Sequence, residues 1–393
     1  MLAFDRELKS RLDAIREQGL HRELRCIESP QGTRIQMGGR TLLNFSSNDY
    51  LGLANHPALK EAAIKATEKL GAGAGASRLI CGSLAPFHEL EEVLAAFKGT
   101  EAALTFSTGY AAALGTITAL LGKGDIIILD KLVHACIVDA ARLSGAKLRV
   151  FAHNDLSDLE EKLRWASQNK ADGQVVVVTE SIFSMDGDAA LLREIVALKD
   201  KYGAWLMVDE AHATGLYGPH RRGLAEALGV SDRIEIQMGT LGKALGASGG
   251  YICGSRALVD FLVNRARSFI FSTAPVPAAA AAAAAAIELI RSSEGERLNN
   301  SVWGLANLLE HSAAAVGISL TSPDSLIMLL IIGEESAAVA AAANLREQGI
   351  FVPAIRYPTV ARGAARLRVT LTAAHTSEDV ATLASALSKI RNA

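Results

Sequence analysis

The sequence predicts an α/β fold with a mostly parallel central sheet in a large domain, a smaller C-terminal α+β domain and an N-terminal helical arm. Three observations support this prediction. Between about residues 100 and 255, short apolar runs rich in β-branched residues alternate with helix-like stretches. These runs are almost continuously apolar, as expected of parallel strands covered on both faces. After about residue 290, longer helical patterns replace the alternation. We therefore expect an arm over 1–45, a large domain over 46–285 and a C-terminal domain over 286–393.

The N-terminal stretch is expected to form an exposed amphipathic helix. It carries acidic and basic residues from its fifth position on, which argues against a secretory or transit leader: MLAFDRELKSRLDAIREQGLHRELR. No other segment resembles a targeting sequence, and we expect a protein of the cytoplasm.

The strands of the large domain end in polar residues. We predict five of them: DIIILD (125–130), KLRVFAH (147–153), QVVVVTE (174–180), AWLMVDEAH (204–212) and IEIQMGT (234–240). Helix-like stretches such as DLSDLEEKLRWASQ separate them. Ligands of such sheets bind beyond the carboxyl ends of the strands, so we expect the functional site there.

The C-terminal third begins with an alanine-rich segment, APVPAAAAAAAAAIELI (274–290). It is shorter than the ~20 apolar residues that cross a bilayer, and Glu288 interrupts it. Alanine favours helix and proline suits a helix start, so a long helix is expected to leave the large domain here, with no membrane contact. Two further strands are expected after it: SLIMLLIIG (325–333) and ARLRVTLTA (365–373).

Composition excludes several classes of function. Half of the 393 residues are hydrophobic and 21% are charged, which supports a substantial core and argues against disorder. The net charge of −2 gives no sign of a nucleic-acid-binding surface. The four cysteines form no CxxC pair, which fits reduced thiols better than disulfides or a metal site.

Lys243 is the most isolated cation of the chain. It lies in GTLGKALGASGG (239–250), and the nearest charged residues are Glu235 and Arg256. Asp209 directly follows the apolar run WLMV, where a half-buried carboxylate requires a cationic partner. Lys243, one strand later, is the nearest candidate, and a plain ion pair between the two is the simplest interpretation.

The small residues around Lys243 favour a second interpretation, a lysine that binds an aldehyde cofactor. Glycine and alanine let a planar ligand approach the backbone. Pyridoxal phosphate needs such a lysine, a carboxylate on its ring nitrogen and a phosphate cradle. The turn Ser107-Thr108-Gly109 opens an apolar helix whose N-terminus would favour a phosphate. With Asp209 and His212 between this turn and Lys243, the order of the residues predicts a pyridoxal-phosphate site.

Five motifs together resemble those of the α-oxoamine synthases, a family of fold-type I pyridoxal-phosphate enzymes. They are SSNDYLGL (46–53), STGYAA (107–112), VVTESIFSMDGD (177–188), VDEAHATG (208–215) and GTLGKALGASGGY (239–251). The resemblance covers about residues 20 to 385. It implies a transferase that condenses an amino acid with an acyl-CoA thioester and releases carbon dioxide, acting as a homodimer with shared active sites.

The resemblance implies roles at the cofactor ring. Lys243 would bind the cofactor covalently and later remove the Cα proton of the substrate, and Asp209 would pair with the ring nitrogen. His134 would stack over the ring and also face the substrate, while Ser184 and His212 would reach the phenolic oxygen. Without the resemblance, His134 would be an ordinary helix-start histidine and Ser184 a turn cap.

The resemblance also implies a phosphate site. Gly109, Tyr110 and Thr240 would lie along the phosphate, and Thr273 would be offered to it by the neighbouring subunit. Both threonines could instead be ordinary strand-end hydroxyls.

Besides His134, four residues are implied to face the substrates. Asn48 and Arg356 resemble substrate-facing positions, with Arg356 as the clamp on the amino acid's carboxylate, since a guanidinium forms two parallel hydrogen bonds to such a group. Arg22, on the N-terminal helix, and Thr359 would line the path of the acyl chain. An arginine on such a helix is ordinarily solvated.

The C-terminal segment indicates the substrates. FVPAIRYPTVARGAARLRVTLTAAHT (351–376) resembles the family members that use alanine and pimeloyl-CoA. Tyr357, however, stands where their pattern has a proline, and Tyr-Pro resembles members that use glycine and acetyl-CoA. We expect the first pair of substrates and keep the second as the alternative.

Three interpretations outside this family are weaker. GASGG (246–250) matches a nucleophile elbow with Ser248 as a hydrolase nucleophile, but an elbow needs a strand before it and a helix after it. GAGAGAS (71–77) suggests a dinucleotide loop, but it follows a helical pattern where a strand is required. A non-catalytic binding module would be expected to lack Lys243, Asp209 or His212.

Overall fold

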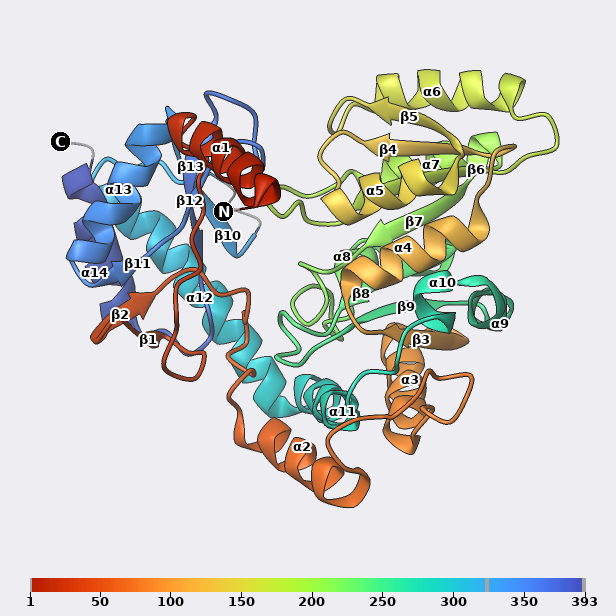
Figure 1. Ribbon diagram of the computed structural model, residues 1–393, viewed down its shortest axis with the longest axis horizontal. Coiled ribbons are helices and arrows are strands. Elements are labelled where there is room, and N and C mark those ends of the chain that lie inside the picture. The colour runs from red at the N-terminus through yellow and green to blue at the C-terminus, as the bar shows by residue number, and fades with distance from the viewer. Residues whose placement is uncertain (1, 322–324, 391–393) are drawn as a thin grey trace. The chain divides into compact units, whose positions relative to one another are not determined.

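The structure, a computed structural model, describes residues 2–321 and 325–390 (Figure 1). The chain forms two compact units. The large unit comprises Asn48–Ser184 and Asp188–Ser301. The small unit comprises Met1–Ser47, Met185–Gly187 and Val302–Ala393, so that both ends of the chain belong to it.

A seven-stranded sheet forms the centre of the large unit, in the order β3-β9-β8-β7-β6-β4-β5 (Figure 1). Strands β8, β7, β6, β4 and β5 run parallel, and β9 is antiparallel to both β8 and β3. All five predicted strands are confirmed, each slightly shorter than predicted. The strands are β3 (Ala102–Phe106), β4 (Ile126–Asp130), β5 (Lys147–Phe151), β6 (Val175–Glu180), β7 (Trp205–Asp209), β8 (Ile236–Thr240) and β9 (Gly250–Gly254).

Helices α4 (Gly109–Leu120), α5 (Ala135–Ser144), α9 (Arg256–Arg265) and α10 (Arg267–Ile270) cover one face of this sheet with a continuous apolar core. Helices α6 (Leu156–Asn169) and α7 (Leu192–Tyr202) pack on each other and on β4, β5 and β7. A third group, α2 (Pro57–Leu70), α3 (Ala85–Lys98) and α11 (Pro277–Arg291), packs together. The short α8 (Leu224–Ala227) and a 3-10 turn (Ser231–Arg233) precede β8.

The small unit contains two three-stranded sheets. One pairs the hairpin β1 (Arg34–Met37) and β2 (Arg40–Asn44) with β11 (Ile350–Phe351). The other has the order β10-β13-β12, with bounds Ile327–Gly333, Ala365–Thr370 and Ala354–Ile355. Helices α13 (Glu335–Glu347) and α14 (Ser377–Ile390) accompany them, and α12 (Ser293–Ala315) begins in the large unit. Both strands expected after residue 290 are confirmed.

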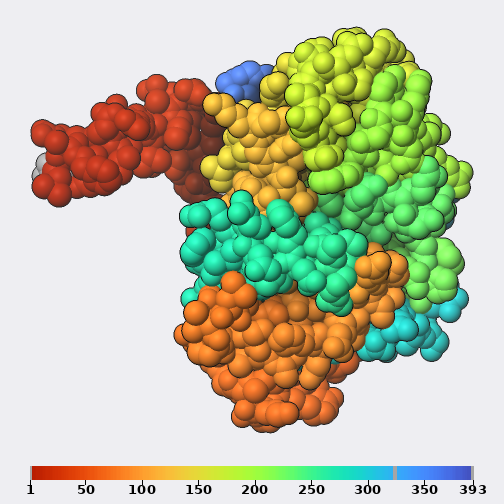
Figure 2. Space-filling view, turned by 90° about the vertical axis from the view of Figure 1, so that its right-hand side faces the viewer, coloured from red at the N-terminus to blue at the C-terminus, as the bar shows by residue number. Residues whose placement is uncertain are grey.

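The N-terminal helix α1 spans Ala3–Glu17 and has no buried residue. Its apolar side chains recur every three or four residues at Phe4, Leu8, Leu12 and Ile15, and all four are exposed. Figure 2 shows this helix, in red, uncovered on its visible face. Since α1 ends at Glu17, the prediction that Arg22 lies on it is wrong: two turn residues follow the helix, and Arg22 is in a non-helical segment.

The alanine-rich segment is helical, as predicted, and begins at Pro277. It ends at Arg291, where Ser292 has an extended backbone and separates α11 from α12. The expectation that this helix leaves the large domain is wrong: α11 lies within the large unit, where it packs on α2 and α3, and α12 is the helix that continues into the small unit. Among the described residues, none of the helices combines the length and apolar character needed to cross a membrane.

Candidate active site

The loop from β8 to β9 carries Lys243. Thr240, at the end of β8, organises this loop: its hydroxyl donates to the Gly249 carbonyl at 3.0 Å and accepts the Gly242 N–H at 3.2 Å. Gly246 has φ +61°, and a Cβ there would lie 2.5 Å from the backbone of Leu53. Glycine at position 246 is therefore required by the tight path of the loop itself.

Lys243 ends a chain of polar contacts in the large unit. Its Nζ lies 2.6 Å from Nε2 of His212, whose Nδ1 lies 2.7 Å from the Tyr50 hydroxyl. Tyr50 donates to Oδ1 of Asn48 at 3.4 Å. One arrangement of protons satisfies all three contacts: Nδ1 of His212 donates to Tyr50, and its Nε2 accepts from Lys243. The structure thus brings three predicted site residues together through Tyr50, which the sequence analysis did not single out although it lies in SSNDYLGL.

Two acidic side chains lie at the carboxyl ends of neighbouring strands. Asp209 ends β7 and Glu180 ends β6, and the two residues are register partners. Both are buried. Burial raises the pKa of Asp209, while the charge of Lys243 and the Ala211 N–H, which Asp209 Oδ1 accepts at 2.9 Å, oppose this rise. A further cation at this edge of the sheet would therefore be stabilised.

A buried ion pair supports the segment after Asp209. Glu210 accepts from Lys98 Nζ at 3.1 Å and from the Ala225 N–H at 2.8 Å, and both charged side chains are almost fully buried. Gly223 passes so close that a Cβ there would overlap Oε2 of Glu210, and its φ of +140° is one that side chains disfavour. Glycine is therefore required at this position to keep the ion pair in place.

The N-terminus of α4 lies against the end of the sheet. Thr108 caps it by accepting the Ala111 N–H at 3.0 Å, which leaves other N–H groups of the first turn outside the helical hydrogen bonds. Gly250 permits the approach, because a Cβ there would lie 2.6 Å from the Gly109 backbone. Gly109 also lies beside Thr240, at ordinary contact distance. These are the backbone donors and the hydroxyl that a phosphate site requires.

His134 and Tyr110 lie on the two helices next to this edge. His134 caps α5: its Nδ1 accepts the Cys136 N–H at 3.2 Å and lies 3.0 Å from the Cys136 thiol, while the ring is exposed. Its helix-start interpretation is thus correct, and it does not conflict with a stacked ring. Tyr110 donates to Asp139 Oδ2 at 2.6 Å, which ties its phenol to α5.

Thr273 lies in an exposed part of the large unit. It forms an isolated β-bridge with Ser77, and the Ala274 N–H donates to the Ala76 carbonyl at 3.0 Å. Large apolar side chains around this bridge are exposed: Leu79, Ile80, Phe271 and Val276. The loop GAGAGAS (71–77) directly follows helix α2, so the strand that a dinucleotide loop requires is absent there.

The small unit brings three further predicted residues together. Arg22 Nη2 donates to the Thr359 hydroxyl at 3.3 Å. Arg356 Nη2 donates to the His21 carbonyl at 2.9 Å, and its buried Nε has no partner among the described residues. An unsatisfied guanidinium N–H beside Arg22 and Thr359 fits a site for an anionic group.

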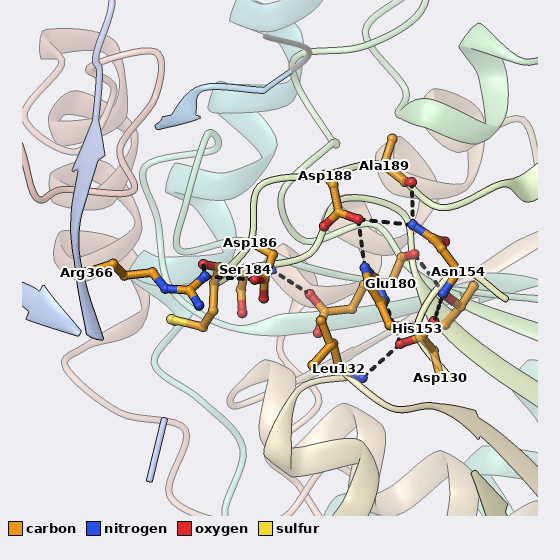
Figure 3. Close-up of polar contacts among 12 residues, drawn as sticks. Asp130, Leu132, His153, Asn154, Glu180, Ser184, Asp186, Asp188, Ala189 and Arg366 are labelled. Carbon is orange, nitrogen blue, oxygen red and sulfur yellow. Dashed lines mark hydrogen bonds and ion pairs between the residues drawn. The ribbon is translucent and has the colours of Figure 1, made fainter. Parts of the chain in front are cut away.

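A cluster of polar residues around His153 was not predicted from the sequence (Figure 3). His153, just beyond β5, lies 3.0 Å from Asp130 Oδ1 and 2.7 Å from Asp188 Oδ2. Asn154, with φ +53°, donates to the same Asp188 oxygen. Burial opposes the charged ring, but the hydrogen bonds and charges of both aspartates outweigh it and raise the pKa of His153 to about 10. The available signal in the sequence was the position of His153 at the end of a predicted strand.

Arg366 was also missed. In the small unit it donates to Asp186 Oδ1 at 2.7 Å and to the Met185 carbonyl at 3.0 Å (Figure 3). These contacts hold the short segment Met185–Gly187. Nothing in the pattern of ARLRVTLTA distinguished this buried arginine from an exposed one.

The hydrolase interpretation of Ser248 is wrong. Ser248 is exposed in the loop between β8 and β9, and β9 begins two residues later. A nucleophile elbow needs a strand directly before the serine and a helix directly after it, and this loop has neither.

These groups fit pyridoxal phosphate. The large unit supplies an amine, a buried carboxylate on the adjacent strand, an exposed imidazole and a capped helix N-terminus, which together match the aldehyde, ring nitrogen, ring face and phosphate of this cofactor. The buried carboxyl group of Asp209 also favours an added cation, as a protonated pyridine would be. Fold and site define a fold-type I pyridoxal-phosphate enzyme.

Comparison with known proteins agrees. Residues 40–387 match the family described as aminotransferase class I and II. The 8-amino-7-oxononanoate synthase of Geotalea daltonii is 46% identical over 379 residues, 96% of each chain. A serine palmitoyltransferase variant of S. paucimobilis, solved with PLP and myriocin bound, has TM-score 0.92 and 29% identity, covering 98% of this chain and 97% of its own.

A solved 8-amino-7-oxononanoate synthase of Francisella tularensis has TM-score 0.75 and 28% identity, covering 89% of this chain and 98% of its own. The chain belongs to the aminotransferase class I and II family and, within it, to the 8-amino-7-oxononanoate synthases, which are α-oxoamine synthases. The resemblance, the fold-type I architecture and the cofactor expected from the motifs are confirmed.

Proposed function

We propose that the protein condenses L-alanine with a pimeloyl thioester and releases carbon dioxide and coenzyme A, giving 8-amino-7-oxononanoate for biotin biosynthesis. The observation that carries this is the contact of Lys243 Nζ with His212, one strand from buried Asp209, in a chain 46% identical to a protein named for that product.

Five residues would hold the ring of the cofactor: Lys243 by its amine, Asp209 at the ring nitrogen, His134 on the ring face, and Ser184 with His212 at the phenolic oxygen. Gly109, Tyr110 and Thr240 would hold the phosphate at the start of α4, together with Thr273 of the partner subunit. When bound, pyridoxal phosphate supplies the electron sink that stabilises negative charge at the substrate Cα.

His212 is placed to exchange a proton with Lys243. Nε2 of His212 accepts from Nζ at 2.6 Å, which gives the amine a neighbour that can receive a proton from it. Tyr50 and Asn48 fix the orientation of the imidazole from the other side. Lys243 is thereby prepared to take the Cα proton of the substrate and later to return a proton to that carbon. Arginine could not do this, because its guanidinium keeps its charge.

Arg356 would bind the carboxylate of the amino acid, using the Nε–H that has no partner among the described residues. Arg22 and Thr359, which are hydrogen-bonded to each other, would contact the acyl substrate. Asn48, which accepts a hydrogen bond from Tyr50, would contact the substrate.

The test is release of coenzyme A by the purified enzyme with alanine or glycine, each combined with pimeloyl-CoA or acetyl-CoA. We expect the highest kcat/KM for alanine with pimeloyl-CoA. Activity only with glycine and acetyl-CoA would overturn the substrates and leave the reaction type standing. No release of coenzyme A with any pair would overturn the reaction type.

One feature favours the second pair of substrates. Tyr357 lies beside Arg356, its bond to Pro358 is cis, and the Arg362 guanidinium stacks 4.3 Å from the centre of its ring. The stacked side chains of Tyr357 and Arg362 would leave less space for an acyl chain, which would suit acetyl-CoA. Replacement of Tyr357 by proline is then expected to raise kcat/KM for pimeloyl-CoA relative to acetyl-CoA.

The protein is further proposed to act as a homodimer in the cytoplasm. The exposed apolar residues around the Ser77–Thr273 bridge and the exposed stripe of α1 support a second copy as partner. All four cysteines are free, which fits a reducing compartment.

A further inference from the structure

Glu180 connects two of the proposed cofactor-binding residues. It ends β6 and is 2% exposed. Its Oε2 accepts the Ser184 N–H at 3.2 Å (Figure 3), and the backbone N–H of His134 faces the same carboxyl group. Its Oε1 is buried without a partner among the described residues. One side chain therefore binds the backbone of the loop after β6 and faces the backbone at the start of α5.

The charges around Glu180 disfavour its ionised form. Asp209 on β7 adds a negative charge, Lys243 after β8 adds a positive one, and His134 and Cys136 face it from α5. Burial raises the pKa of the Cys136 thiol to about 12, so this group stays neutral. Burial, followed by the charge of Asp209, raises the pKa of Glu180, and Lys243 with the N–H groups of Ser184 and His134 offsets this only in part.

We propose that Glu180 is a positioning residue of the cofactor site that holds the backbones of His134 and Ser184 as a neutral carboxylic acid. The carbonyl oxygen of the acid accepts the N–H groups, and the proton is on Oε1. A buried hydroxyl without a partner costs less than a second buried carboxylate charge beside Asp209. Asp209 then remains the anion that faces the ring nitrogen. The proposal rests on the roles proposed above for His134 and Ser184.

The first experiment compares Glu180→Gln with Glu180→Ala in the full-length enzyme. Glutamine keeps the acceptor and is neutral, whereas alanine removes the acceptor. We expect Glu180→Gln to bind pyridoxal phosphate within about threefold of wild type at pH 7, and Glu180→Ala to bind it about tenfold more weakly, the effect of one lost buried hydrogen bond. Equal losses in both variants would overturn the proposal.

The second experiment measures the proton directly. The infrared difference spectrum of wild type minus Glu180→Gln is expected to contain the carbonyl stretch of a protonated carboxylic acid at pH 7. A carboxylate band in its place would overturn the proposal. Glu226→Gln, at a carboxylate that pairs with Arg222 and His220, is the control and should remove a carboxylate band.

The third experiment follows thermal unfolding from about pH 5 to about pH 9. A group with a raised pKa in the fold stabilises it most below the ordinary glutamate value of about 4.3, and this stability is lost as the pH rises. Glu180→Gln should therefore lose less Tm than wild type over this range, and an equal loss would contradict the proposal. None of the three measurements requires turnover, so a wrong choice of substrates would leave them unaffected.

Discussion

Lys243 is in hydrogen-bond contact with an imidazole that can exchange a proton with it. The simple expectation was a pairing with Asp209, and the amine also lies 2.6 Å from Nε2 of His212. A neutral amine is the form that can bind an aldehyde or take a proton from carbon. The charge of Lys243 still acts on Asp209, whose pKa it lowers against the effect of burial.

Lys243→Ala is expected to fold and to bind pyridoxal phosphate without the absorption band of the lysine-bound cofactor. Turnover should fall by at least about 10²–10⁴-fold, the contribution of a positioned base. Absorption spectra and coenzyme A release measure the two effects. Lys243→Arg is the matched control: it keeps the charge and should be equally inactive. Normal turnover by either variant would refute the proposed role.

His153 is the positively charged centre of its cluster. It joins Asp130 at the end of β4 to Asp188 in the segment after β6. The raised pKa of about 10 means that the stability it provides is complete below the ordinary histidine value of about 6.5 and is lost as the pH rises through about 10.

His153→Gln should therefore lower the free energy of unfolding by about 2–3 kcal/mol at pH 7, because two carboxylates lose their cation. The difference from wild type should shrink as the pH approaches 10. Urea unfolding at several pH values measures it. His220→Gln, at an exposed histidine that also contacts a carboxylate, is the control and should change little. A loss that is constant with pH would show that the charge of His153 does not matter.

At the scale of elements, the contact of α4 with β9 determines where a phosphate can bind. The first turn of α4 reaches the sheet edge only because Gly250 has no side chain. A methyl group there meets backbone atoms of Gly109 and Thr108 at 2.6 Å, and these atoms belong to the turn itself. The helix start would have to move away.

Gly250→Ala is expected to weaken pyridoxal phosphate binding by about tenfold or more, since the N-terminal N–H groups would lose their alignment. The dissociation constant of the cofactor is the measurement. Gly124→Ala, at a turn where no atom lies within 4 Å of the new methyl group, should bind the cofactor as wild type does. Equal affinity in both variants would place the phosphate elsewhere.

The individual strands differ in how well they could be predicted from the sequence. The strands of the parallel sheet were found because β-branched runs such as VVVV are distinctive. Strand β3 was missed because AALTF is short and rich in alanine, which favours helix. The hairpin of β1 and β2 and the two-residue strands at 350 and 354 depend on tertiary pairing that leaves little local pattern.

For the whole molecule, the motifs identified which residues gather at the sheet edge but could not give their contacts. Asp209 and Lys243 follow neighbouring strands, so their proximity was predictable from topology. The contact between His212 and Lys243, and the position of Tyr50 behind His212, depend on loop conformation. The division into an arm over 1–45 and domains over 46–285 and 286–393 stays a prediction.

A shared site predicts complementation between inactive subunits. Thr273→Asp should repel the phosphate in the site of the partner subunit, and Lys243→Ala removes the amine from its own site. Each variant alone should be inactive, whereas co-expressed chains should regain up to about a quarter of wild-type activity through mixed dimers with one intact site. Coenzyme A release and sedimentation measure this. A monomer, or no recovery, would contradict the shared site.

The close approach of Gly223 to Glu210 affects how this chain tolerates random mutation. Every replacement of Gly223 adds a carbon where the carboxylate of Glu210 meets Lys98, one residue from Asp209. A growth-based survey of all single substitutions should therefore find that replacements of Gly223 are tolerated nearly as poorly as replacements of Lys243. The positions at which substitution abolishes growth would then include a residue that takes no part in the chemistry and is needed only for the space it leaves.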